Sequence, residues 1–354
     1  MYQALRLFPA MFMASAIIIC YGCGSTTAVN KSSPTTGADR VEYTLVYIIH
    51  GDGDYLYHDA EGRPQRADKK VLKEALQVGA NAQSGEVYIF HLRPERRILG
   101  LLPRKDRRFI YYRYGEMIHD TRYSPGKTLF ASERQLFHSR HDSNRTRRED
   151  KRKVLLFFGH QIPATGGDTY HRTYHKTAVN IQTFSESLAS FLYAGQDAFD
   201  LLVLSTCNNG TPAMASALTS TAQYLLASPQ DLHLSHIDTG ALQLLEKTPE
   251  TDGKSLGEAL GQATYDRLSS SIYTAITLSL YDLKKKDLHA HKADMVRPSE
   301  TDRDNVDCAD TQGFSENTLS DPISTWYRPA LFGKKQGKIF HSGWGCPQTE
   351  SVSP

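Results

Sequence analysis

The sequence lacks the motifs of several common functional classes. Its 354 residues contain no internal repeat, no glycine loop of the phosphate-binding kind and no spaced zinc motif. The acidic stretch HGDGD at 50–54 does not have the spacing of an EF-hand loop, so no motif supports calcium binding. A large excess of charge of one sign is also missing, because the formal net charge is only +2. That balance gives no reason to expect nucleic acid or an anionic membrane as the main partner.

A hydrophobic run long enough to span a membrane is absent as well. The apolar stretch from Leu7 to Tyr21 follows Arg6 and precedes small residues, which is the pattern of a secretory signal. Gly22-Cys23-Gly24-Ser25 is similar to a bacterial lipoprotein box, although Cys20 stands where leucine is usual. We expect a signal peptide at 1–23 with lipidation at Cys23, a flexible tether at 24–40 and export to the cell envelope. An ordinary cleaved signal, or an incorrectly assigned chain start, are the alternatives.

Cysteine is scarce, with five in the chain. Without Cys20 and Cys23, the remaining three are Cys207, Cys308 and Cys346, which is an odd number. In an oxidising compartment Cys308 and Cys346 could form a disulfide and leave Cys207 as a free thiol. That thiol is either buried and inert or a nucleophile.

What the sequence does contain is a series of short apolar runs alternating with helical patterns. With 40% hydrophobic residues, the chain can bury a full-sized core. Strands are predicted at 43–49, 86–92, 154–158, 201–204, 222–227 and 275–280, and helices at 71–78, 179–193, 211–220, 238–246 and 255–271. An extended hairpin or edge arm is predicted at 107–118. We therefore predict an α/β domain at 41–295 with a mostly parallel sheet, followed by an irregular carboxyl-terminal extension at 296–354.

Two of the apolar runs end at residues whose side chains could take part in catalysis. The run 154–158 leads to Gly159-His160, and the run 201–204 leads to Ser205-Thr206-Cys207. A helical crossover between parallel strands would place His160 and Cys207 at one sheet edge, where ligands bind in open α/β sheets. A histidine beside a thiol can take its proton, and free backbone N–H groups of the two turns can stabilise an oxyanion. With 14 histidines in the chain, an accidental pairing stays open.

The blocks VLLFFGH and FDLLVLSTC resemble those of the clostripain-like cysteine peptidases, which share the caspase and gingipain fold. TLVYIIHGDGD, AQYLLASPQDLHLSHIDTGAL and AITLSLYDL extend the similarity over about residues 43–288. The resemblance implies a three-layer α/β/α sandwich with a caspase-like sheet. It also implies peptide-bond hydrolysis with His160 as general base and Cys207 as nucleophile, without a cofactor. The backbone N–H groups of Gln161 and Cys207 would form the oxyanion hole.

The sequence departs from that family at two places. Gln161 follows the histidine where the family usually has glycine, and Ser205-Thr206 precede the cysteine where the family often has Asp-Ala. Ser205, Thr206 and Ser228 are the candidates for the substrate pocket. A neutral serine cannot offset desolvation of a P1 arginine or lysine as a carboxylate would, so the P1 preference is left open.

Other readings of the histidines and of the function remain. His50-Gly51 has the glycine that position 160 lacks and is a second candidate base. A metal site at His171, His175, His233 and His236 is disfavoured by the irregular spacing of these residues. The leading prediction is an exported cysteine peptidase that acts on peptide or protein and touches the membrane only through a lipid anchor. The alternatives are an envelope lipoprotein that binds a peptide or protein partner without cleaving it, and another cysteine-dependent amide hydrolase.

Overall fold

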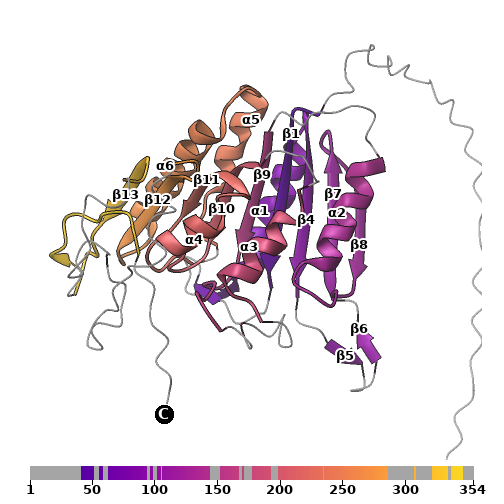
Figure 1. Cartoon of the computed structure of the whole chain (residues 1–354), viewed down its shortest axis with the longest axis horizontal. Helices are drawn as coiled ribbons and strands as arrows, with labels where there is room; N and C mark the ends of the chain where they lie inside the picture. Colours follow the sequence, from indigo (N-terminus) through magenta and orange to yellow (C-terminus); the bar gives the residue numbers. More distant parts are fainter. Residues whose placement is uncertain are drawn as a thin grey trace, which may run out of the picture. The chain divides into compact units, whose positions relative to one another are not determined.

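A nine-stranded sheet in the order β13-β12-β11-β10-β9-β1-β4-β7-β8 organises the chain (Figure 1). The computed structural model describes residues 41–51, 56–58, 63–93, 96–98, 102–104, 106–143, 152–166, 170, 178–192, 198–233, 235–285, 307, 321–333 and 336–345. The predicted signal peptide, the tether and Cys23 lie outside these residues. Residues 40–354 form one unit.

The centre of the sheet consists of five parallel strands. They are β1 (Tyr43–His50), β4 (Gly85–Leu92), β9 (Arg152–Phe158), β10 (Phe199–Ser205) and β11 (Ala222–Ala227). All eight residues of β1 and of β4 are buried. Strands covered on both faces need apolar side chains on both sides, which is why these segments read as nearly continuous apolar runs in the sequence.

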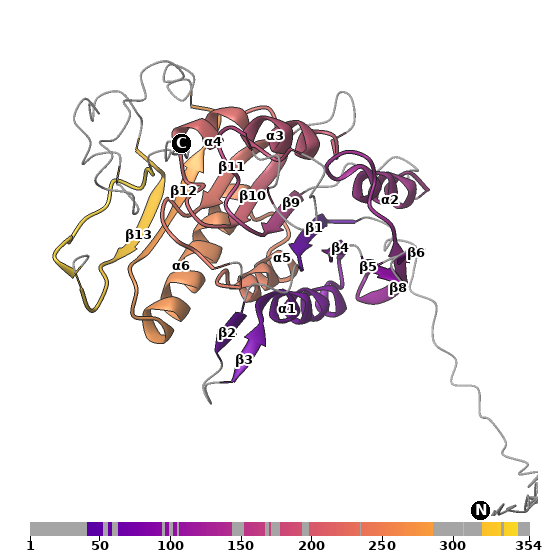
Figure 2. The same ribbon diagram turned by 90° about the horizontal axis from the view of Figure 1, so that it is seen from below.

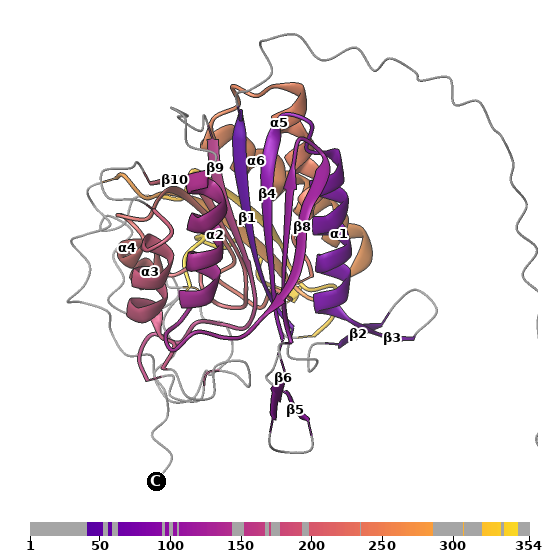
Figure 3. The same cartoon turned by 90° about the vertical axis from the view of Figure 1, so that its right-hand side faces the viewer.

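Helices cover both faces of the sheet (Figure 3). One face carries α2 (Ala131–Ser143), α3 (Ile181–Ala189) and α4 (Pro212–Ala217), and the other carries α1 (Ala67–Asn81), η2 (Thr239–Gln243), α5 (Leu244–Lys247) and α6 (Gly253–Ser271). Each face has its own buried hydrophobic cluster. The predicted three-layer α/β/α sandwich with a mostly parallel sheet is therefore confirmed.

Antiparallel strands complete the sheet on both sides. Beyond β4 lies the hairpin of β7 (Arg107–Arg113) and β8 (Glu116–Tyr123), which turns through Tyr114 and Gly115, both with positive φ. Beyond β11 lie β12 (Ile276–Asp282) and β13 (Ser324–Arg328). The last of these belongs to the segment that the sequence predicts to be irregular, yet it forms the ninth strand.

Two small ribbons follow central strands. β2 (Leu56–His58) pairs with β3 (Pro64–Arg66), and β5 (Arg96–Ile98) pairs with β6 (Leu102–Arg104). Figure 2 shows them from below. Among the residues described, no helix has both the length and the apolar character to cross a bilayer.

The carboxyl-terminal segment returns to the sheet near the end of β10. The backbone N–H of Gly345 donates to the carbonyl oxygen of Gly210 at 2.9 Å. The Trp344 ring packs on Tyr281, with ring centroids 4.3 Å apart. Gly345 also forms an antiparallel bridge with Asp307. Cys308 and Cys346, each the next residue along the chain, lie outside the described residues, so their disulfide stays a prediction.

Candidate functional site

The ends of β9 and β10 bring the predicted histidine and cysteine to neighbouring loops. The two strands are parallel neighbours, with Ser205 opposite Phe158 as the last pair in register. The N–H of Gly159 donates to the Ser205 carbonyl at 3.2 Å, which continues the pairing past the strands. His160 and Cys207 follow at this one edge, as the order of strand, helix and strand predicts.

Two asparagines join the loops. The side-chain amide of Asn209, 1% exposed, bonds both backbone groups of Ile162, accepting from its N–H and donating to its carbonyl at 2.9 Å each. Asn208, which has a φ of 51°, donates from Nδ2 to the Gln161 side-chain oxygen at 3.1 Å. Asparagine tolerates this left-handed conformation better than most residues. These bonds fix the cysteine loop against the histidine loop.

Cys207 is a half-buried, free thiol. Its sulfur donates a hydrogen bond to the carbonyl oxygen of Leu232 at 3.5 Å. Burial raises the pKa of Cys207, and the carboxylate of Asp231 acts in the same direction. At neutral pH the group is therefore a thiol, and a base must take its proton before it can attack a carbonyl carbon.

His160 is half-buried on the neighbouring loop. The Tyr170 hydroxyl donates to the backbone carbonyl of His160 at 2.8 Å. The two rings meet edge to face, with centroids 6.4 Å apart. Tyr170 also lies edge to face with the ring of His50 at 6.0 Å. Tyr170 thus holds the loop on which the predicted base lies.

A third loop, after β11, packs against Cys207 and contains two further histidines. The ammonium group of Lys70 lies 3.5 Å from the Ser235 carbonyl, and the Arg267 guanidinium donates to the carbonyls of Ser235 and His236. Burial lowers the pKa of His233, and the charges of Lys70 and His160 lower it further. Burial, His233 and the two cations lower the pKa of His236 to about 3. Both imidazoles are therefore neutral at pH 7.

The two backbone amides predicted for the oxyanion hole have no acceptor among the residues that the structure describes. Neither the N–H of Gln161 nor that of Cys207 donates a hydrogen bond to another residue in the described parts of the chain. A fixed N–H without an acceptor is the kind of group that stabilises a developing oxyanion. The role of these amides stays a prediction.

The three predicted pocket residues are fully buried. Ser205, Thr206 and Ser228 each have an exposed fraction of 0%. The Thr206 hydroxyl donates to Asn209 Oδ1 at 2.7 Å, and the Ser228 hydroxyl lies 2.6 Å from the Thr277 carbonyl. Ser205 Oγ lies 3.4 Å from the His233 carbonyl. In this arrangement the hydroxyls bond internal groups, and their contact with substrate stays a prediction.

The β1 and β4 half of the same edge is buried. His50 is 2% exposed and packs edge to face on Phe157 at 5.0 Å. His91 Nε2 lies 2.8 Å from Asp68 Oδ2, and both residues are at most 5% exposed. Arg66 also bonds Asp68, at 3.1 Å. His50, the alternative base, is thus enclosed by aromatic rings, whereas His160 keeps partial access to solvent.

The four histidines that the sequence disfavours as a metal site are only partly described. His233 and His236 lie with ring centroids 5.3 Å apart. His171 and His175 lie outside the described residues. Within the described residues there is no group of three or more His, Cys, Asp or Glu side chains arranged to hold a metal ion.

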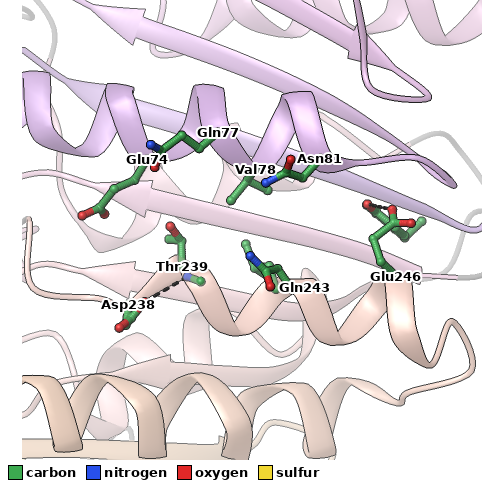
Figure 4. Close-up of a pocket in the computed structure, with 11 residues that line it drawn as sticks. Glu74, Gln77, Val78, Asn81, Asp238, Thr239, Gln243 and Glu246 are labelled. Atoms are coloured by element: carbon green, nitrogen blue, oxygen red, sulfur yellow. Dashed lines mark hydrogen bonds between the residues drawn. The ribbon is translucent and has the colours of Figure 1, made fainter.

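A separate pocket of about 390 Å³ lies between α1 and the η2–α5 segment (Figure 4). Glu74 and Gln77 on α1 face Asp238 and Thr239 across it. Glu246 lies at its other end and accepts a hydrogen bond from Tyr43. None of the residues predicted for the site lines this pocket.

Sequence reasoning missed two side chains that define the site. Asp231 is exposed, accepts from Asn208 Nδ2 at 3.2 Å and acts on the pKa of Cys207. Asn209, which follows the cysteine by two positions, reaches across to the histidine loop. The paired asparagines after the cysteine were the available signal, since one amide can bond two backbone groups at once.

Solved structures with this arrangement of elements exist, although no protein-family model and no curated protein sequence matches the chain. A secreted C11 cysteine protease from Bacteroides thetaiotaomicron is 12% identical, with a TM-score of 0.50 over 70% of this chain and 67% of that one. Its complex with an irreversible peptide inhibitor is 11% identical, with a TM-score of 0.50 over 71% and 68%.

An inactive zymogen C11 protease from Parabacteroides distasonis is 12% identical, with a TM-score of 0.43 over 72% of this chain and 64% of that one. The chain thus spans about two thirds of the length of the solved proteins it matches. The fold implied by the resemblance to clostripain-like peptidases is confirmed. At this level of identity the likeness concerns the fold, and the chain has the α/β fold of the C11 cysteine proteases.

Proposed function

We propose that the protein is a cysteine peptidase that hydrolyses peptide bonds through Cys207 and His160. The observation that carries the proposal is the adjacent placement of the two residues after β9 and β10, tied together by Asn209 and Ile162. The C11 protease fold supports it. The peptide inhibitor bound to one solved relative supports a peptide as the substrate.

In the proposed reaction His160 takes the thiol proton as sulfur attacks the carbonyl carbon. The oxyanion is stabilised by the N–H groups of Gln161 and Cys207. The imidazolium then protonates the leaving amine, and water releases the acid from the thioester. Because the thiol donates to the Leu232 carbonyl, it has to turn away from that carbonyl toward His160 when substrate binds. Hydrogen bonds between catalytic groups often form only in the substrate complex.

Digestion of a peptide library by the purified protein tests this function. We expect cleavage at a restricted set of P1 residues, together with loss of cleavage in Cys207→Ala. Cys207→Ser is the matched variant, because it keeps the volume of the side chain. Cleavage that persists in both variants would contradict the mechanism, and the library also reports the P1 preference.

A second candidate is an envelope protein that keeps the fold and binds peptide or a protein partner without cleaving it. It is favoured by the raised pKa of Cys207 and by its hydrogen bond to Leu232, both of which stabilise the neutral thiol. The rate at which iodoacetamide modifies Cys207 separates the two. Modification that stays slow in the presence of peptide, with peptide bound but intact, identifies the binder.

We also propose that the protein is exported and held at the envelope by lipidation of Cys23. The leader pattern at 1–23 supports this location, and one solved relative is described as secreted. Mass spectrometry of the protein from its native membrane tests the anchor, because a lipidated chain would begin at Cys23. The same measurement under non-reducing conditions tests the Cys308–Cys346 disulfide. The mechanism requires no cofactor.

A further inference from the structure

We propose that the pocket between α1 and the η2–α5 segment binds a linear polyamine, a chain with ammonium groups at both ends. The pocket has a volume of about 390 Å³. Glu74, Asp238 and Glu246 contribute three carboxylates, and no lysine, arginine or histidine is among the described residues that line it. A concave site with carboxylates and without basic side chains favours a cationic ligand. The proposed peptidase residues take no part, so this proposal does not depend on peptidase activity.

The three carboxylates lie at opposite ends of the pocket. Glu74 on α1 faces Asp238 at one end, and Glu246 lies at the other (Figure 4). From Glu74 to Asn81, α1 advances about 10 Å along the pocket. Carboxylates at the two ends cannot share one metal ion, and the described residues include no group of three or more arranged to hold one. Two separate positive charges therefore match the site better than one divalent cation.

The middle of the pocket suits a methylene chain that carries an amine. Val78 and Leu242 give it apolar surface, and Leu242 is 2% exposed. The side-chain amides of Gln77, Asn81 and Gln243 line the same stretch (Figure 4). Each amide has an oxygen that can accept a hydrogen bond from an amine N–H. The order of carboxylate, apolar surface and carboxylate matches the order of ammonium, methylene chain and ammonium in a polyamine.

Glu74 lacks a full set of partners at its end of the pocket. Its Oε1 lies 3.6 Å from the Arg267 guanidinium, whereas its Oε2 is buried and has no hydrogen-bond donor in the described parts of the chain. Burial raises the pKa of Glu74, Arg267 and Lys70 lower it, and the charge of Asp238 raises it. The side chain is 24% exposed, so a small rotation brings Oε2 to a ligand. An ammonium group there would form the missing charge-assisted hydrogen bond.

A buried hydroxyl at the same end also points to a ligand. Tyr47 on β1 is 0% exposed, and its hydroxyl has no hydrogen-bond partner among the described residues. Burial raises the pKa of Tyr47, the Thr239 side chain lowers it and the charge of Glu74 raises it. The hydroxyl therefore lies beside two residues that line the pocket, although Thr239 does not complete a hydrogen bond of normal geometry. Unpartnered buried polar groups are rare, and an amine at this end would give Tyr47 a partner.

The opposite end holds its carboxylate in a fixed position. Oε1 of Glu246 accepts a hydrogen bond from the Tyr43 hydroxyl and another from the N–H of Ser84, the second at 3.1 Å. Both bonds fall on this one oxygen, and among the described residues no donor reaches Oε2. Burial and the hydrogen bond to Glu246 raise the pKa of Tyr43, so its hydroxyl stays a donor at neutral pH. A carboxylate that is already oriented loses little freedom when a ligand binds.

Isothermal titration calorimetry of the full chain with spermidine tests the proposal. We expect one saturable site, and we expect Asp238→Asn and Glu246→Gln each to weaken binding about 10- to 100-fold, because each removes the charge from one hydrogen bond and keeps the side-chain shape. Asparagine caps helices as aspartate does, so Asp238→Asn retains the start of η2. Glu258→Gln is the matched control, because it removes a carboxylate that is 41% exposed, paired with Lys254 and outside the pocket. Its affinity for spermidine should be unchanged.

A series of ligands tests the same site without any substitution. Acetylspermidine has lost one terminal ammonium group and should bind at least about tenfold more weakly than spermidine. Equal affinities for the two would overturn the proposal, as would displacement of spermidine by equimolar magnesium or calcium. It would also be overturned by the absence of saturable binding at millimolar spermidine, by unchanged affinity in both pocket variants, or by an equal loss of affinity in Glu258→Gln.

Discussion

At the carboxyl ends of the parallel strands, the β9–β10 half and the β1–β4 half both have histidines, but these differ in burial and in hydrogen bonding. After β9 and β10, His160 and Cys207 are half-buried and lie beside backbone amides that have no acceptor among the described residues. After β1 and β4, His50 and His91 are enclosed, and His91 is bound to Asp68. A histidine therefore does not identify a site by itself. Access to solvent, together with backbone N–H groups that have no acceptor among the described residues, distinguishes the candidate reactive half from the half that supports it.

The largest effect should come from removing the proposed base. We expect His160→Ala to lower kcat/KM by about 10²- to 10⁴-fold, the range that general base catalysis contributes. His50→Ala should change kcat/KM little per folded molecule, since His50 is 2% exposed. Hydrolysis of a fluorogenic peptide found in the library screen measures both. The reverse order of effects would move the base to the other half of the edge.

Breaking the enclosed pair should affect stability instead of catalysis. Asp68→Ala leaves the buried His91 ring and Arg66 without their shared carboxylate. Because burial lowers the pKa of His91, its ring is neutral at pH 7, and loss of its hydrogen bond to a carboxylate should cost about 1.5–3 kcal/mol. The exposed pair of Arg108 and Asp120, each 36% exposed, gives the matched control, and Asp120→Ala should cost less than about 1 kcal/mol. Urea unfolding measures both free energies. Equal costs would mean that burial does not separate the two pairs.

Acid should weaken the fold through a histidine of the third loop. The pKa of His236 is about 3 in the folded protein, below its ordinary value of 6.5. Its contribution to stability is present above pH 6.5 and is lost as the pH falls toward 3, because the unfolded chain binds a proton that the folded chain does not. The loss amounts to about 1.4 kcal/mol per pH unit in that window. Unfolding of His236→Gln between pH 7 and 5 should show a shallower slope, and an unchanged slope would refute the assignment.

The smallest expected effect concerns the thiol. Asp231 raises the pKa of Cys207, so Asp231→Asn should lower that pKa and increase the fraction of thiolate. We expect alkylation at pH 8 to become roughly twofold faster, with the difference shrinking in high salt because Asp231 is exposed. Glu250→Gln, remote from the thiol, serves as the control. Slower alkylation in Asp231→Asn would show that this carboxylate assists the thiol.

The sequence predicted the parts of the fold whose signal is local. Continuous apolar runs identified the central strands. The helix predicted at 211–220 contains α4, which begins at Pro212 and is capped by the Thr211 hydroxyl accepting from the N–H of Met214. β13 was missed because STWYR is short and has two polar residues followed by two aromatic ones, with no continuous apolar run, and its pairing partner β12 is more than 40 residues away.

The parts of the site that depend on strand order were predictable in the same way. Strand order along the chain was enough to place His160 and Cys207 at one edge. The Leu232 carbonyl that accepts the hydrogen bond of the thiol, and the His91 ring that contacts Asp68, come from segments joined only by tertiary packing. No spacing in the sequence reports such contacts. For the same reason the burial of Ser205 and Ser228 could not be anticipated from their position at strand ends.

The hydrogen bond from Gly345 to Gly210 has a consequence for the order of biogenesis. The loop after Cys207 obtains part of its support from a residue 135 positions later (345 − 210), and Tyr281 bonds Gly210 as well. A ribosome or a secretion channel delivers the amino-terminal residues first, so the cysteine is released long before its loop can be completed. The loop of the proposed nucleophile therefore gains this hydrogen bond only after residue 345 has emerged. A chain shortened before Gly345 would lack the bond.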